Sequence, residues 1–143
     1  MILRNIGGNE MKKFIIMIMT LILSFACVAC SNEPKEPQHI LTFKEGKMVT
    51  MDETEYVGIF FEYTNNSDET AVICDEINVK AFQNGVELNI VVHTGQETEG
   101  AIQCDTSVQA DTTTDVVWLF EKQDDSPVSV ECTDGQKFKF ELK

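Results

Sequence analysis

The clearest strand signal in this chain is the run Tyr56-Val57-Gly58-Ile59-Phe60-Phe61-Glu62-Tyr63. It is rich in aromatic and β-branched residues, which fit a pleated sheet, and its centre is apolar on both faces. The run ends at Asn65-Asn66-Ser67-Asp68, whose side chains can bond their own backbone and tolerate turn geometry. We therefore predict a strand over 56–63 with a turn directly after it.

Two shorter strands are expected before this run. Ile40-Leu41-Thr42-Phe43 is a short apolar start, and Met48-Val49-Thr50-Met51 is the next strand-like stretch. Between them, Glu45-Gly46-Lys47 has the composition of a turn, because glycine commonly interrupts regular structure. We predict that the chain reverses there.

A hairpin is expected after the first turn. Ile77, Val79 and Ala81 alternate with polar residues, and Val86-Glu87-Leu88-Asn89-Ile90 alternates again. Asn84-Gly85 lies between the two runs, and this pair is the strongest short-range hairpin signal because both residues accept a positive φ.

The C-terminal half continues the strand pattern after a polar segment. Residues 94–111 read mostly as loop, and Thr114 to Phe120 reads as a strand with Trp118 on its apolar face. Val128 to Cys132 alternates next, and Asp134-Gly135 turns the chain into a last alternating run over 137–142.

These runs predict an all-β fold. No segment beyond the N-terminal apolar run shows sustained helical spacing. About seven short strands in a domain of roughly 100 residues are typical of an immunoglobulin-like antiparallel β-sandwich. The period-two faces would supply the core between two sheets. A small barrel is the alternative, and the strand order stays open.

The N-terminal residues have the pattern of a bacterial lipoprotein signal peptide over 11–29. Two lysines follow Met11, and an apolar run extends from Phe14 to Ala26. That run is shorter than the about 20 residues that a spanning helix needs, so cleavage is favoured over a permanent transmembrane anchor. Cys27-Val28-Ala29-Cys30 resembles a lipobox, which makes Cys30 the predicted lipidation site.

Alternatives to this processing remain. Cys27 could be lipidated instead, but the bulky Phe25 near that cut makes the site weaker. An ordinary signal peptide with incidental cysteines is disfavoured because a polar, proline-containing stretch begins directly after Cys30. We interpret residues 1–10 as an upstream extension that is not translated, since codons for Gly7-Gly8 can encode a ribosome-binding sequence ahead of Met11.

The mature chain divides into residues 30–38, a lipidated cysteine with a flexible tether, and residues 39–143, a single domain. A diacylglyceryl group supplies two acyl chains, and each buried CH₂ contributes about 0.8 kcal/mol. The lipid alone would therefore hold the protein at the extracytoplasmic face of the cell membrane.

The mature chain is strongly acidic. From Cys30 onward it has 23 Asp and Glu against 8 Lys and Arg, a net charge of −15. Such a surface repels phosphate backbones and anionic headgroups, so nucleic-acid binding is excluded as a leading function. Membrane attachment must then come from the lipid.

Two motifs are similar to those of a known family. The run Val57–Thr70 is a strand followed by TNNSDE, and Val79–Leu88 reads VKAFQNGVEL where the family shows VKVFQNGVEL. On these motifs the chain resembles the DUF5067 family from about His39 onward. The resemblance implies an immunoglobulin-like domain on lipoproteins of Gram-positive bacteria, and it implies no catalytic residues. Ala110-Asp111-Thr112 stands where the family usually has a Pro-Gly turn.

Three cysteines lie in the predicted domain, where export permits disulfides. Cys132 continues an inward face and is expected to be a small buried apolar residue. Cys74 and Cys104, at a strand edge and in a loop, are the pair expected if a bridge forms, worth about 3–4 kcal/mol in the chain-entropy model. Three free thiols are the alternative. A zinc site is disfavoured because His93 has no spaced partner and no Cys-x₂-Cys pair exists in the mature chain.

No catalytic motif is present. His93 needs a nucleophile or an orienting acid to act as a base, so an edge-strand or surface histidine is the better interpretation, and His39, next to the tether, is a weaker candidate still. The acidic clusters at 52–55, 111–115 and 124–125 lack the spacing of a calcium loop and are interpreted as solvated turns. We interpret Trp118 as a core residue.

The leading hypothesis is a non-enzymatic lipoprotein domain, without cofactor, that binds or scaffolds another envelope protein or a cell-wall component. Loop 94–111 is its expected contact surface, because such long connections are often functional. A weak calcium or metal sensor is the second hypothesis, and a hydrolase built on His93 is the third.

Overall fold

The computed structural model describes residues 36–142, and every structural statement below concerns this part of the chain. The predicted signal peptide and Cys30 lie outside it. Eleven strands and one helix are present: β1 His39–Met51, β2 Thr54–Asn65, β3 Ala71–Val72, α2 Ile73–Glu76, β4 Val79–Gln83, β5 Val86–Glu87, β6 Ile90–Val91, β7 Ile102–Gln103, β8 Ser107–Val108, β9 Thr112–Glu121, β10 Val128–Cys132 and β11 Lys137–Phe140. In this part no helix has the length and apolar character to span a bilayer.

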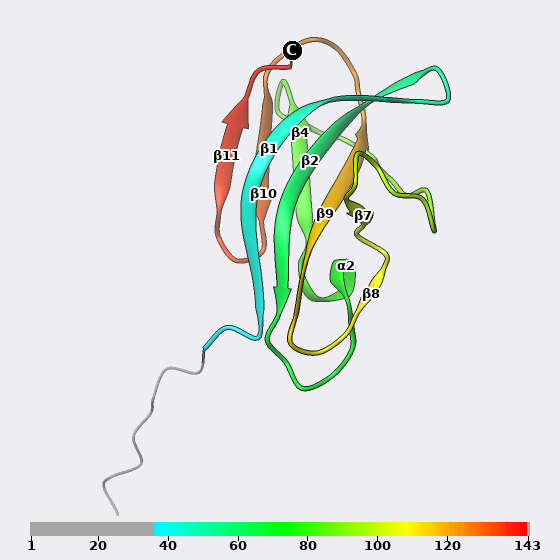
Figure 1. Ribbon diagram of the computed structural model, residues 1–143. Helices are drawn as coiled ribbons and strands as arrows, with labels where there is room; N and C mark the ends of the chain where they lie inside the picture. Colours follow the sequence, from blue (N-terminus) through cyan, green and yellow to red (C-terminus); the bar gives the residue numbers. More distant parts are fainter. Residues whose placement is uncertain (1–35, 143) are drawn as a thin grey trace, which may run out of the picture. The chain divides into compact units, whose positions relative to one another are not determined.

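Two sheets enclose the core, as Figure 1 shows. The first has the order β1-β2-β9-β6, with β7 also paired to β9, and the second has the order β11-β10-β4-β5. A further small sheet joins β3 to β8. All pairs are antiparallel except β7 with β9. The predicted all-β, antiparallel sandwich is confirmed.

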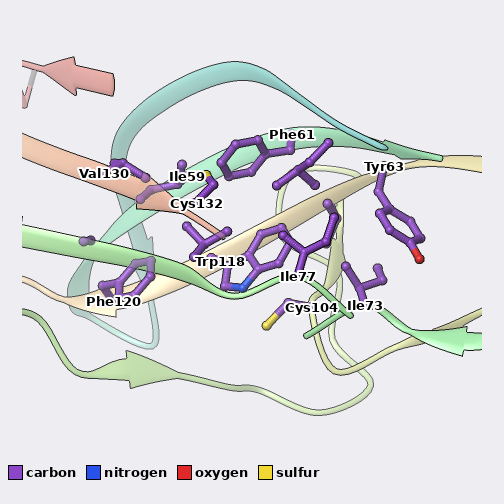
Figure 2. Packing of buried hydrophobic residues seen from close by; sticks show 14 of the residues in the cluster. Ile59, Phe61, Tyr63, Ile73, Ile77, Cys104, Trp118, Phe120, Val130 and Cys132 are labelled. Atoms are coloured by element: carbon purple, nitrogen blue, oxygen red, sulfur yellow. The ribbon is translucent and has the colours of Figure 1, made fainter. Parts of the chain in front are cut away.

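The main core lies between the two sheets and is built by alternate residues of each strand. Ile59 and Phe61 of β2 are fully buried, and Trp118 of β9 is 1% exposed. Phe61 and Trp118 meet edge to face with 5.4 Å between ring centroids, and both lie in the cluster drawn in Figure 2. Such a pair adds about 0.5–1.5 kcal/mol beyond its buried area. Trp118 is a core residue, as predicted.

The outer face of the first sheet is also covered. An outer cluster of buried residues lies there, formed by Val49, Phe60, Ala101, Val117 and Leu119. The cover is held by side chains: Gln103 Nε2 donates to Thr98 Oγ1 at 2.9 Å, and Thr98 Oγ1 donates to Met51 Sδ at 3.5 Å. This explains why the centre of β2 is apolar on both faces.

The predicted turn at 45–47 is wrong. One strand, β1, runs through it and pairs with β2 along its length, with a bulge between Phe43 and Glu45. A Cβ built at Gly46 would lie 2.3 Å from the ring of Phe140. Glycine is therefore present to make room for a ring from the opposite sheet, not to reverse the chain.

The hairpin at Asn84-Gly85 is confirmed. Asn84 has φ 51° and Gly85 has φ 79°, and the turn joins β4 to β5. The predicted strand over 86–90 is divided, however, because β5 pairs with β4 whereas β6 pairs with β9. The chain changes sheets at Leu88, which is 4% exposed and lies in the main core.

The segment 94–111 contains more order than the loop prediction allowed. It holds β7 and β8, an isolated bridge between Thr98 and Ala101, and a turn in which Thr106 N–H donates to Gln103 O at 3.0 Å. The one-turn helix α2 lies beside it, since Cys74 N–H donates to Cys104 O at 2.9 Å. The sequence did not reveal these elements, because the segment is polar and each element has only a few residues.

Candidate functional site

Cys30 lies outside the described residues, so its lipidation stays a prediction. The structure does describe where the tether arrives. β1 begins at His39, and its 13 residues end at the β1–β2 turn. At about 3.3 Å per residue, the turn lies roughly 40 Å from the point where the tether enters. We call these the tether end and the distal end of the domain.

The tether end is closed by a buried aromatic contact. His39 Nδ1 and the Tyr63 hydroxyl share a hydrogen bond of 2.8 Å, and the rings stack with 6.1 Å between centroids. His39 Nε2 lies 3.4 Å from Glu76 Oε2 of α2. Burial and the charge of Glu76 raise the pKa of Tyr63. His39 is the first residue of β1, at the position where the domain was expected to begin.

A shallow polar groove lies beside this contact. Its volume is about 280 Å³, and it is lined by Gln38, His39, Ser67, Asp68, Glu69, Thr70, Ala71 and Glu76. Asn65, fully buried, shapes one wall: its Nδ2 donates to Glu69 O at 2.9 Å and to Val108 O at 3.0 Å. Asn65 Oδ1 accepts from Ser67 N at 3.1 Å, as expected of the asparagine cluster.

The distal end contains a loop fixed by one buried side chain. Gln83 is fully buried, and its Nε2 donates to Asp124 O and Ser126 O, each at 2.9 Å. Its Oε1 accepts from Gln123 N at 2.9 Å. The amide therefore satisfies backbone groups on both sides of the loop, which a buried polar group requires. Sequence reasoning missed Gln83 because it occupies an inward position of an alternating strand, where a core residue is expected.

The surface of this loop is acidic and organised by ion pairs. Lys122 Nζ lies 2.9 Å from Glu55 and 2.6 Å from Asp125. Asp124 accepts from Asn84 Nδ2 at 2.8 Å. The hydroxyl and backbone N–H of Ser126, also bonded to Asp124, lower the pKa of that carboxyl. Exposed pairs of this kind contribute about 0–1 kcal/mol each, so they position the loop more than they stabilise the fold.

The acidic clusters lie in turns and on exposed strand positions. Asp52 and Glu53 form the β1–β2 turn with φ 47° and 65°, and Asp111 has φ 54°. Asp115 pairs with Lys44 at 2.7 Å. Within residues 36–142, no three His, Cys, Asp or Glu side chains come together as a metal site would require. The metal-sensor alternative gains no support from these contacts.

His93 lies beside an aromatic ring. It meets Tyr56 edge to face with 5.5 Å between centroids, and its Nε2 is buried without a hydrogen-bond partner. The neighbouring Thr94 donates its hydroxyl to Asp105 at 2.8 Å instead. The contacts of His93 are thus those of a packing residue.

The three cysteines occupy two places in the domain: Cys74 and Cys104 lie together, and Cys132 lies apart on β10. All three are free thiols in the structure. Cys74 N–H donates to Cys104 O at 2.9 Å, which places the two residues side by side. Cys132, 7% exposed, belongs to the main core. Burial raises the pKa of both Cys104 and Cys132 to about 12.

Fold and surface together define an all-β domain whose first strand begins at His39 and whose opposite end carries a fixed acidic loop. Residues 38–134 match the family described as "Domain of unknown function (DUF5067)", and the chain belongs to this family. The matched segment begins at the residue before β1 and ends just after β10. No curated protein and no solved structure matches the chain.

Proposed function

We propose that this chain is a membrane-anchored extracytoplasmic lipoprotein whose domain binds or scaffolds another component of the cell envelope and catalyses no reaction. The observation that carries the proposal is the placement of the two ends of β1. The predicted lipid and tether lead to His39, and the β1–β2 turn lies at the far end of the same strand. An anchor at Cys30 would leave the distal end free to meet a partner.

The loop at the distal end is held in one conformation, which favours binding. Gln83 ties the 123–126 segment to β4, and Lys122 ties it to β2 through Glu55. A loop that is ordered before binding loses less conformational entropy on association. Exposed carboxylates dominate this end, so the fitting partner is a cationic segment of an envelope protein or a cationic wall polymer.

We expected loop 94–111 to form the contact surface, but the exposed part of this loop is smaller than predicted. Residues 101, 103, 104 and 108 are buried, whereas residues 94–97, 99 and 100 are exposed. Those exposed residues lie between β6 and β7, on the covered side of the first sheet. We therefore place the main contact surface at the distal loops.

The test is a site-directed photocrosslink in intact cells. A photoreactive residue replaces Asp125, whose side chain is 88% exposed at the distal end, and in a matched strain it replaces Asp68 at the tether end. We expect a discrete crosslinked band from position 125 that is weakened by Asp52→Lys and absent from position 68. No band above background from either position, under conditions where the protein is exported, would count against a binding role.

A further inference from the structure

Cys74 and Cys104 are brought together by an extension of the small β3–β8 sheet. In that sheet Ala71 pairs with Val108 and Val72 pairs with Ser107. The pattern continues into α2, because Ile73 N–H donates to Thr106 O at 3.4 Å. It then slips by one residue at the 103–106 turn, which places Cys74 opposite Cys104.

The resulting geometry suits a disulfide. The backbone bond from Cys74 N–H to Cys104 O is 2.9 Å long. Only this one backbone bond joins the two residues, so a hydrogen-bonded ladder pair, with Cα atoms about 5.5 Å apart, serves as the nearest reference geometry. Disulfides span Cα distances of about 4.4–6.8 Å, so neither backbone segment has to move far for a bond to form. The two thiols lie near enough for each to influence the pKa of the other.

We propose that Cys74 and Cys104 form a structural disulfide in the exported protein, which fastens the segment between β7 and β8 to α2. Cys132 is not expected in the bridge, because it lies on β10 and pairs there with Val79, whereas the backbone of Cys74 is bonded directly to that of Cys104.

The bond forms by exchange with a low-molecular-weight disulfide, R–S–S–R, outside the cell. Cys74 is the entry point, since it is half-exposed whereas Cys104 is buried. The Cys74 thiolate attacks one sulfur of the oxidant, forming a mixed disulfide and releasing one thiolate R–S⁻. The Cys104 sulfur then loses its proton and attacks the Cys74 sulfur, releasing the second R–S⁻. Two protein thiols are oxidised, and one R–S–S–R is reduced to two R–SH.

The sequence offers a direct readout. Trypsin cuts after lysine, so each cysteine falls in a different peptide: Cys74 in 48–80, Cys104 in 81–122 and Cys132 in 123–137. The full-length protein is expressed in a host that exports it, and free thiols are alkylated during lysis. After digestion without reductant we expect peptides 48–80 and 81–122 as one linked species, and peptide 123–137 in the alkylated form.

A stability measurement distinguishes a disulfide between Cys74 and Cys104 from two neighbouring free thiols. Reductant should lower the melting temperature of the exported protein by roughly 10 °C, because the bridge closes a long loop in the unfolded chain. Cys132→Ala should keep this response to reductant, and Cys74→Ala should abolish it. Complete alkylation of both 48–80 and 81–122, or linkage through 123–137, would overturn the proposal. Neither result depends on whether the domain binds a partner.

Discussion

At the scale of single residues, close packing decides what several side chains do in this domain. Gly46 in β1 faces the ring of Phe140 from the opposite sheet, where a Cβ would come within 2.3 Å. Gln83 occupies an inward position on β4, yet it bonds to the loop after β9. In both cases a neighbour that is distant in sequence determines which residue type fits the position.

Gly46→Ala should therefore destabilise the domain, although glycine within a strand is ordinarily a cost. Forcing a methyl group against Phe140 should lower the free energy of unfolding by about 1–3 kcal/mol, measured by urea denaturation. In a Phe140→Ala background the same change should reverse sign and stabilise by about 0.5–1 kcal/mol, because only the lost backbone entropy remains. An equal cost in both backgrounds would refute the packing explanation.

Cys132 gives a pH dependence whose direction follows from its burial. Desolvation, aided by the charge of Asp134, raises its pKa from 9.0 to about 12. Below pH 9 the thiol is protonated in the folded and unfolded states, so its contribution does not change. Between pH 9 and 12 the unfolded chain releases the proton and the folded chain keeps it, so stability falls as pH rises.

The check compares the wild-type chain with Cys132→Val, which keeps the apolar character and removes the titrating group. With reductant present, the wild-type chain should lose stability relative to the variant above pH 9, by at most about 1.4 kcal/mol per pH unit. Parallel pH profiles for the two proteins would contradict the assignment.

At the scale of elements, the sequence predicted the strands that alternate and missed the features set by distant contacts. The run over 56–63 and the Asn84-Gly85 turn were found because their signals are local. The reversal at Gly46 was wrong because its reason lies on β11, in another sheet. Strands β7 and β8 escaped notice because two residues carry no measurable period.

The same contrast between local signals and distant contacts holds for the residues of the candidate site. The proximity of Cys74 and Cys104 was expected from their positions at a strand edge and in a loop, and the structure joins them by a backbone hydrogen bond. The role of Gln83 could not, because its partners at 123–126 lie about 40 residues away and their carbonyl groups leave no trace in the sequence.

The cover over the outer face of β9 yields a prediction at this scale. Leu119 belongs to the outer cluster and is fully buried, so Leu119→Ala should cost about 2–5 kcal/mol in the free energy of unfolding. Glu62 of β2 is exposed, and Glu62→Ala should stay within about 0.5 kcal/mol. A cost near zero for Leu119→Ala would mean that the segment around Ala101 does not cover the sheet in solution.

At the scale of the whole molecule, one strand connects the tether end of the domain to its distal end. β1 starts at His39, where the predicted tether joins the domain, and its 13 residues reach the distal turn. Most of its length pairs with β2, which in turn pairs with β9 in the middle of the sheet. A pull on the predicted tether would therefore act along a strand held by many backbone hydrogen bonds.

That arrangement depends on Cys30, and its lipidation is testable with two matched variants. Cys30→Ala should abolish incorporation of radiolabelled palmitate and release the protein from the membrane fraction, because the two acyl chains supply the whole attachment energy. Cys27→Ala removes the competing cysteine three residues earlier and should leave both labelling and membrane retention intact. If Cys27→Ala instead lost the label while Cys30→Ala kept it, the tether would begin at Cys27. If the wild-type chain took up no palmitate label and neither variant changed the fractionation, the lipoprotein interpretation would fail and the distal end would have no fixed orientation toward the membrane.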